Sequence, residues 1–300
     1  MKIEAKKFVY SFSKDHEPLA HVKAGETVDI EMLDAFANQL RNEGDKIDSL
    51  DWNKVNAATG PIFVEGAEDG DILKVTINKI TLDNKGTVLA GENFGLIGHL
   101  LKGSHVKIVH IRDGMAEFSN KLKLPLNPMI GVIGVAPEGE AVNTGTPGKH
   151  GGNMDNLMVK EGAVLYFQVK APGALFSIGD LHAVMGDGEI GVAGLEIPGV
   201  VNLTLDVIKN KEITHPILEN EEVVTVVASA LTSDEAAVIA TEEMFNLIKG
   251  KVSLPDPEIV MLMSLVGQLQ ICQMVDPLKT VRFVMRKEHL EGKGVLELLR

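Results

Sequence analysis

The chain has 300 residues, of which 45% are hydrophobic and 24% charged, a composition that is typical of soluble globular proteins and excludes wholesale disorder and a fibrous architecture. Its 29 basic and 42 acidic residues give a net charge of −13, and because that field repels polyanions we expect no nucleic-acid partner. The longest apolar stretches, such as 129–136, are shorter than the roughly 18 residues that cross a bilayer, so we expect no membrane partner either.

The cellular setting is inferred from the one cysteine and from the first residues. Cys272 has no second cysteine with which to form an intramolecular disulfide, so nothing ties the chain to an oxidising compartment. The first residues, MKIEAKKFVYSFSKDHEP, lack the apolar core of a signal peptide. We therefore expect a cytoplasmic protein.

At least eight segments alternate apolar and polar residues with the period of two that is typical of half-buried strands. Gly- and Pro-rich turns separate them rather than helices, which favours antiparallel packing over a βαβ arrangement. In chain order they are three short stretches within 2–32, followed by 72–82, 106–112, 163–170, 174–180, 199–209 and 223–230. Because no linker or repeat divides the chain, we expect one mainly β, β-sandwich-like domain over residues 1–300.

Two helices are predicted in the C-terminal third, over 233–249 and 256–274. Thr232 and Glu235 form a T-x-x-E capping box before the first, and Asp256 is a candidate N-cap for the second. The second helix is apolar on nearly every side, so we expect it to be buried between layers or at a subunit contact. On that basis we expect a homo-oligomer, a dimer.

Polar residues and glycines are concentrated in a first run, 131–156. Glu138, His150, Asn153 and Asp155 lie in it among glycines, which let the backbone approach a ligand closely. The hexapeptide HGGNMD alone places three polar groups in six residues, and a catalytic site needs polar groups converging from separate loops. This run is therefore a candidate part of a site.

A second run, 177–198, contains Asp180 and His182, which project from the same face if their strand continues. Such a pair of a carboxylate and an imidazole suits Zn²⁺ or another divalent ion. Glu189 and Glu196 follow within fourteen residues of His182 and extend the candidate ligand set. Asp187, in GDGE, is as well explained by a solvated turn as by a ligand role.

For each of three other residues, the sequence is compatible with two roles. Glu65 follows a predicted strand and either charges a turn or faces the same pocket. His99 lies in an apolar setting that suits a core histidine as well as a functional one. Cys272 falls on the predicted helix 256–274, where a free thiol is usually an inert small hydrophobe, so a cysteine nucleophile is disfavoured.

Six runs between residues 59 and 277 resemble, in order, the signatures of the acetamidase/formamidase family. They read TGPIFVEGAEDGD, PMIGVIGVAPEG, TGTPGKHGGNMDN, SIGDLHAVMGDGEIGVAGLE, SDEAAVIATEEMF and LMSLVGQLQICQMVDP. The resemblance implies an amidohydrolase that cleaves short aliphatic amides, such as formamide or acetamide, to the carboxylate and ammonia. It also implies a β-sandwich-like body and metal ions associated with the site.

Amide hydrolysis needs a strong nucleophile, an electrophile for the carbonyl oxygen and a proton donor for nitrogen, and a bound metal supplies the first two. The ion expected is Zn²⁺, with Ca²⁺ as the alternative, and its candidate ligands are Asp180, His182, His150, Asp155 and Glu65. The candidate catalytic residues are Glu138, whose burial would raise its pKa, Asn153 as an oxyanion donor, and Glu196, which is also an alternative ligand. The candidate substrate-binding residues are Gly151, Gly152 and Met154.

A small substrate implies a small pocket that excludes longer amides sterically. The candidate wall residues are Met129, Met154, Leu181 and Met185. Two other functions remain open: hydrolysis of another small C–N substrate, and a non-catalytic, metal-stabilised β-sandwich that only binds.

Overall fold

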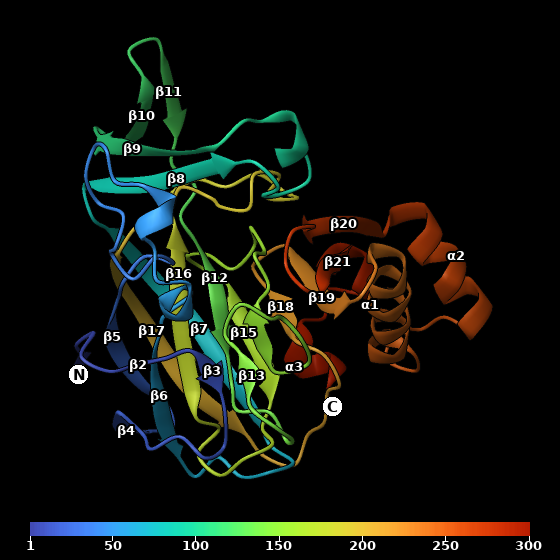
Figure 1. Cartoon of the computed structure of the whole chain (residues 1–300). Helices are drawn as coiled ribbons and strands as arrows, with labels where there is room; N and C mark the ends of the chain where they lie inside the picture. Colours follow the sequence, from blue (N-terminus) through green and yellow to red (C-terminus); the bar gives the residue numbers. More distant parts are fainter.

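A nine-stranded sheet forms one layer of the computed structural model, which describes residues 1–300 (Figure 1). Only the first pair of strands in this sheet is parallel, and every other neighbouring pair is antiparallel. The order is β1 (Lys2–Ile3), β5 (Glu26–Met32), β17 (Gly199–Ile208), β7 (Ile72–Leu82), β15 (Val164–Gln168), β18 (Ile217–Glu219), β19 (Val223–Ala230), β21 (Lys279–Arg286) and β20 (Gln268–Gln273).

A six-stranded sheet packs against the first. It contains β14 (Gly151–Asn153), β12 (Met129–Gly134), β16 (Phe176–His182), β6 (Ala58–Glu65) and β2 (Phe8–Val9), with β4 (Ala20–Lys23) parallel to β6. A core of 34 buried residues joins the two sheets, with Ile30, Val75 and Leu203 from the first sheet and Ile133 and Ile178 from the second. Burial of these aliphatic faces stabilises the pair. The mainly β, antiparallel, sandwich-like fold predicted from the sequence is thus confirmed.

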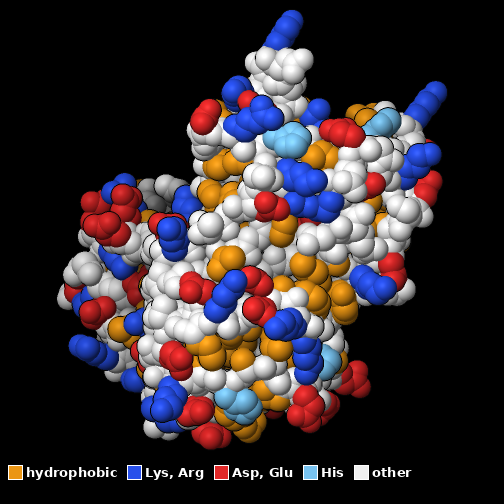
Figure 2. Space-filling model, turned by 90° about the vertical axis from the view of Figure 1, so that its left-hand side faces the viewer, with side chains coloured by type: hydrophobic (Ala, Val, Ile, Leu, Met, Phe, Trp, Pro, Cys, Tyr) orange, Lys and Arg blue, Asp and Glu red, His pale blue; other side chains and the backbone are white.

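Two smaller sheets complete the β-structure. The four-stranded one consists of β8 (Lys85–Gly91), β9 (Ser104–Arg112), β10 (Met115–Ser119) and β11 (Leu122–Pro125), and a two-stranded one pairs β3 (Ser11–Phe12) with β13 (Val142–Asn143). The hairpin of β10 and β11 projects from the top of the molecule in both overall views (Figure 1, Figure 2). Figure 2 also shows lysine, arginine, aspartate and glutamate side chains interspersed on the face turned to the viewer.

The first predicted helix is confirmed as α1 (Ser233–Ile248). The Thr232 hydroxyl accepts a hydrogen bond from the backbone N–H of Glu235, and the Glu235 carboxylate accepts one from the backbone N–H of Thr232. This is the capping box that the sequence predicted. A second core of 17 buried residues joins α1 to the far half of the nine-stranded sheet. The other helices are η1 (Ile47–Ser49), η2 (Trp52–Lys54), η3 (Gly98–Leu100), α2 (Asp256–Val266), η4 (Lys287–Leu290) and α3 (Val295–Leu298).

The predicted helix 256–274 is wrong in its second half. α2 ends at Val266, Gly267 is extended, and the chain continues as the edge strand β20, which pairs with β21. In the sequence QLQICQ, polar and apolar residues alternate, and pairing along β21 satisfies this period of two better than another helical turn would. Cys272 therefore lies on a strand, where it is buried. The N-cap of α2 is Pro255 rather than Asp256.

The outer face of α2 is exposed, contrary to the expected burial between layers. Val260, Met261 and Leu265 have exposed fractions of 53%, 62% and 82%. Burial at a subunit contact, a homo-oligomer and a single domain over 1–300 stay predictions. No helix has both the length and the apolar character needed to span a bilayer.

Candidate active site and metal centre

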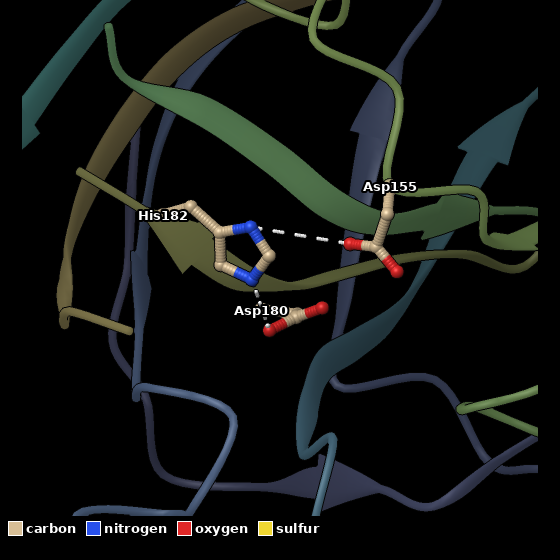
Figure 3. A group of neighbouring side chains, drawn as sticks. All are labelled: Asp155, Asp180 and His182. Carbon is tan, nitrogen blue, oxygen red and sulfur yellow. Dashed lines mark hydrogen bonds and ion pairs between the residues drawn. The ribbon is translucent and has the colours of Figure 1, made fainter. Parts of the chain in front are cut away.

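A buried cluster of acidic side chains around one histidine lies at the end of β16. Asp180 and His182 come from this strand, and Asp155 follows β14 on the other side of β12, so the three side chains approach one another over β12 (Figure 3). The Nε2 atom of His182 lies 3.1 Å from Asp180 Oδ1 and 3.0 Å from Glu196 Oε1, and its Nδ1 atom lies 4.0 Å from Asp155 Oδ1. Glu196 is placed by a bridge between its backbone and that of His182.

Two further carboxylates enlarge the cluster from other loops. Glu189 is buried and accepts a hydrogen bond of 3.1 Å from the backbone N–H of Gly194. Asp276, from the turn after β20, accepts one of 2.9 Å from Asn153 Nδ2. The cluster thus combines five carboxylates with a single imidazole.

The loop that carries Glu189 and Glu196 is fixed to the C-terminal strands. Gly188 donates its backbone N–H to the carbonyl of Cys272 and accepts from the N–H of Met274, at 2.7 and 3.2 Å. The guanidinium of Arg282 on β21 donates two hydrogen bonds to the Asp187 carboxylate, at 2.9 and 2.6 Å. Asp187 is therefore an anchor of this loop, a role that neither interpretation of the sequence anticipated.

Several buried polar atoms of the cluster make no hydrogen bond. Both carboxylate oxygens of Asp155, Oε2 of Glu196, Nδ1 of His182 and Oδ1 of Asn153 are buried without a hydrogen bond. Buried polar atoms in folded proteins are almost always paired, so such a concentration of unpaired ones calls for a ligand. One ligand atom each from Asp155, Asp180 and His182 lie within 4.8 Å of one another, and so do atoms from His182, Glu189 and Glu196. These donor sets fit a divalent cation.

Two glycines give the cluster its room. A Cβ on Gly131 of β12 would lie 2.2 Å from Asp180 Oδ2 and 2.4 Å from Asp155 Oδ1. A Cβ on Gly194 would lie 2.8 Å from His182 Nδ1. Any side chain at either position would occupy the space between the candidate ligands.

Three of the carboxylates are held in a backbone conformation that non-glycine residues rarely adopt. The φ angles of Asp155, Asp180 and Glu189 are 42°, 56° and 47°. Left-handed φ values at non-glycine residues cost free energy and cluster at functional sites. Their concentration around one imidazole supports a functional role for the cluster.

Burial and mutual repulsion set the protonation of the cluster. Burial raises the pKa of Glu189, of Glu196 and of Asp155 well above the ordinary carboxyl value, and for Asp155 the charge of Asp180 adds to the effect. Burial also acts to raise the pKa of Asp180, but the charge and hydrogen bond of His182 outweigh it and lower that pKa. Burial acts to lower the pKa of His182, yet Glu196 and Asp180 hold it well above its ordinary value. A bound cation would replace the protons that such a cluster otherwise retains.

A cavity of about 180 Å³ opens onto the cluster. Its polar floor consists of Asn153, Asp180, Glu189, Glu196 and Asp276, and the rest of its lining is the polar Asn56 and an apolar wall of Ala35, Phe36, Trp52, Val55, Leu89, Phe94, Val192 and Ala193. The wall belongs largely to a small hydrophobic core in which residues of segment 33–56 pack on Leu89 of β8. Segment 33–56 therefore forms one side of the cavity.

Comparison with known proteins identifies the family. The model of the acetamidase/formamidase family matches residues 2–144 and 138–243. The chain belongs to this family. The chain is similar to two solved structures, each with a TM-score of 0.95: a predicted acetamidase/formamidase from Thermoanaerobacter tengcongensis and an acetamidase from Bacillus halodurans. The first is 47% identical, with 98% of each chain covered, and the second is 40% identical, with 98% of this chain and all of the other covered.

Members of the acetamidase/formamidase family with longer chains match only in part. The formamidase of Methylophilus methylotrophus is 26% identical, with 64% of this chain and 62% of that protein covered. The chain thus spans less than two thirds of the length of this curated relative. A γ-lactamase from Delftia acidovorans, 20% identical with a TM-score of 0.65, shares the fold.

The structure brings together five of the site residues predicted from the sequence. Asp155, Asp180, His182 and Glu196 surround one point, and Asn153 lies beside them at the floor of the cavity. The roles predicted for these five residues stay predictions.

Three other predicted site residues lie elsewhere. Glu65 is exposed at the end of β6, seven residues, or about 23 Å of extended chain, from Ala58, which pairs beside Asp180. His150 packs edge-on against Phe12, with ring centroids 4.9 Å apart, and borders a separate cavity of about 690 Å³. Glu138 borders that same cavity.

Glu138 is exposed, so the burial that we expected to raise its pKa is absent and that argument was wrong. The pattern of the sequence placed Glu138 next to a buried strand, and it did not show that the chain turns outward after Ala136. The catalytic role predicted for Glu138 itself stays a prediction.

The predicted substrate-contacting residues are explained by packing. A Cβ on Gly151 would lie 2.2 Å from the Ile133 carbonyl, and a Cβ on Gly152 2.4 Å from the Thr146 carbonyl, so these glycines let β14 approach its neighbours. Met154 belongs to the main hydrophobic core. Like Met154, the other residues proposed as the pocket wall do not border the cavity beside the cluster: Met129, Leu181 and Met185.

Asp276 and the residues of segment 33–56 were missed. Asp276 lies in the last run that resembles the family, and no local spacing connects it with Asn153, 123 residues earlier. Asp34, in the same segment as Phe36, is fully buried, and burial raises its pKa to about 6. Nothing in the alternation of residues 33–56 indicated that they cover a site.

Proposed function

We propose that the protein is a metal-dependent amidohydrolase that hydrolyses small linear amides to a carboxylic acid and ammonia. The observation that carries the proposal is the buried cluster of five carboxylates and one imidazole, with unpaired donor atoms, at the floor of a cavity. Membership of the acetamidase/formamidase family supports the reaction class.

Asp155, Asp180, His182, Glu189 and Glu196 would hold the metal. A mixed set of oxygen and nitrogen donors favours Zn²⁺, because Ca²⁺ prefers oxygen ligands alone. When bound, the ion supplies a Lewis acid for the amide carbonyl and lowers the pKa of a water ligand to about 7. His182 belongs to both candidate donor groups, so it is the residue whose loss disturbs the centre most.

Asp276 and Asn153 are suited to proton transfer and orientation. Burial raises the pKa of the Asp276 carboxyl well above its ordinary value, and the charge of Glu189 adds to this, which favours the protonated form that can donate a proton. Asn153, which lines the cavity, holds that carboxyl by its amide N–H, and its Oδ1 atom is buried without a hydrogen bond. A substrate amide N–H can donate to this oxygen, which turns the leaving nitrogen toward Asp276.

This arrangement favours catalysis over a module that only binds a structural ion. A structural site is closed by its protein ligands, whereas this cluster borders a cavity large enough for a small amide. The left-handed φ angles of three carboxylate residues also support a catalytic role, because strain of this kind is typical of functional sites. Hydrolysis of another small C–N compound remains the alternative function.

Ammonia release from formamide, acetamide, propionamide and urea tests the proposal, before and after chelation and after adding back Zn²⁺ or Ca²⁺. We expect turnover with the linear amides, its loss on chelation and its return with Zn²⁺. His182→Ala should lower kcat/KM at least about 100-fold, since residues that merely orient a metal ligand are worth about 10- to 100-fold. His215→Ala is the matched control, because His215 is also buried but borders a different cavity. Full turnover after exhaustive chelation would refute the metal-dependent mechanism.

A further inference from the structure

The cavity beside the cluster is larger than formamide or acetamide requires. Its volume is about 180 Å³. An apolar cavity of about 150 Å³ holds benzene, which has six carbon atoms, so this one has room for about six non-hydrogen atoms. Formamide has three such atoms and acetamide four. Either would leave part of the cavity unfilled.

The two sides of the cavity differ in chemistry. The carboxylates and Asn153 are at the floor, while Phe36, Val55, Leu89, Phe94 and Val192 form an apolar wall, and the one further polar residue of the lining, Asn56, is uncharged. An amide group placed over the polar floor would therefore direct its acyl chain along the apolar wall. A charged chain would find no partner there and would lose its hydration.

Trp52 lies at the edge of this wall. Its side chain is 51% exposed although it borders the cavity, and its ring centroid is 5.7 Å from that of Phe94. A chain that extends along the wall would cover part of the exposed indole. Since removal of apolar surface from water is favourable, Trp52 adds to the affinity for a longer chain.

We propose that the cavity selects linear amides with an uncharged aliphatic acyl chain of about four carbons, with butyramide preferred to acetamide and formamide. The apolar wall is the acyl-chain site, and Trp52 closes its outer end. This inference rests on the proposed function, since it takes the amide group to lie over the cluster. It contradicts the small, chain-excluding pocket that we expected from the sequence.

Binding is measured first, because it does not depend on turnover. Trp52 is the one tryptophan of the chain, so its emission reports occupancy of the cavity directly, in chelated as well as in metal-loaded protein. Formamide, acetamide, propionamide, butyramide and hexanamide are titrated with emission and calorimetry as readouts. We expect Kd to fall about fourfold for each methylene from acetamide to butyramide, which corresponds to about 0.8 kcal/mol per methylene. A Kd that stays level or rises along this series would overturn the proposal.

Two substitutions introduce larger side chains at the apolar wall and leave the residues of the cluster unchanged. Ala193→Leu and Val55→Phe, both at half-buried positions, should abolish the gain in affinity from acetamide to butyramide. Ala237→Leu, at a half-buried position on α1, is the matched control and should keep the wild-type series. Circular dichroism establishes that each variant is folded. An unchanged chain-length series in both wall variants would contradict the assignment of the wall.

Steady-state kinetics with the same amides separates the two proposals. We expect kcat/KM to rise from acetamide to butyramide in step with binding. Turnover that is fastest with formamide, with no gain along the series, would overturn the acyl-chain site and leave the proposed function intact. Absence of turnover with every amide would overturn the proposed function, while the binding series would still decide whether the wall takes an acyl chain.

Discussion

Replacement of Gly131 by alanine should disable the cluster through a single methyl group. The Cβ would lie 2.2 Å from Asp180 Oδ2 and 2.4 Å from Asp155 Oδ1, whereas real Cβ contacts are essentially never closer than 3.0 Å. Each carboxylate must therefore retreat by about 0.6 to 0.8 Å or rotate away. Because a misplacement of about 1 Å in a catalytic arrangement costs about 100-fold, we expect kcat/KM to fall by about that factor.

The fold should tolerate the change better than the site does. The clashing atoms are the ends of two side chains, so the free energy of unfolding should fall by only about 1 to 3 kcal/mol. Gly139→Ala is the control, because a Cβ at Gly139 meets nothing within 4 Å and the position is exposed. The assays are kcat/KM for a linear amide, bound metal by elemental analysis and the melting temperature. Metal content and turnover of Gly131→Ala within twofold of the control would refute the reasoning.

Two further predictions concern stability. Burial lowers the pKa of His150 from 6.5 to about 4, so the stability that the neutral imidazole contributes is fully present above pH 6.5 and is lost as the pH falls from 6.5 toward 4. Between pH 7.5 and 4.5, the unfolding free energy of His150→Gln in urea should therefore fall by about 2 to 3 kcal/mol less than that of the wild type, and equal losses would contradict the shift. Asp187→Asn leaves the buried guanidinium of Arg282 without its carboxylate and should lower the free energy of unfolding by about 3 kcal/mol or more. Arg282→Met removes the buried charge itself and should cost less, because the remaining Asp187 carboxylate is 40% exposed and can be hydrated. The reverse order of the two unfolding free energies would show that the ion pair is not what anchors the loop.

Local patterns predicted the parts of the fold that depend on neighbouring residues. Alternation of polar and apolar residues identified several strands, such as β7, β17 and β19, and the T-x-x-E signature before α1 became a capping box with both hydrogen bonds. The segment after Gly267 was misassigned because its conformation is decided by pairing with β21, and apolar residues alone do not distinguish a buried helix from an edge strand.

In the site, too, the sequence predicted what neighbouring residues determine and missed what long-range pairing determines. Asp180 and His182 could be predicted as a pair, because side chains two residues apart on one strand project from the same face. His150 and Asp155 are only five residues apart, yet β14 separates them, and only Asp155 reaches the cluster. Asp276 could not be predicted, because its approach to Asn153 depends on how β20 and β21 close the edge of the large sheet.

The attachment of Gly188 to the strand that precedes Asp276 has a consequence for biosynthesis. Four candidate ligands, Asp155, Asp180, His182 and Glu196, leave the ribosome well before the chain that holds their loop in place, since Gly188 bonds to Cys272 and Met274 near the end of the sequence. A nascent chain therefore carries the ligands without the complete scaffold, and the centre takes its final shape only after β20 and β21 have been released and paired. Maturation of the site is thus tied to synthesis of the chain at least as far as β21.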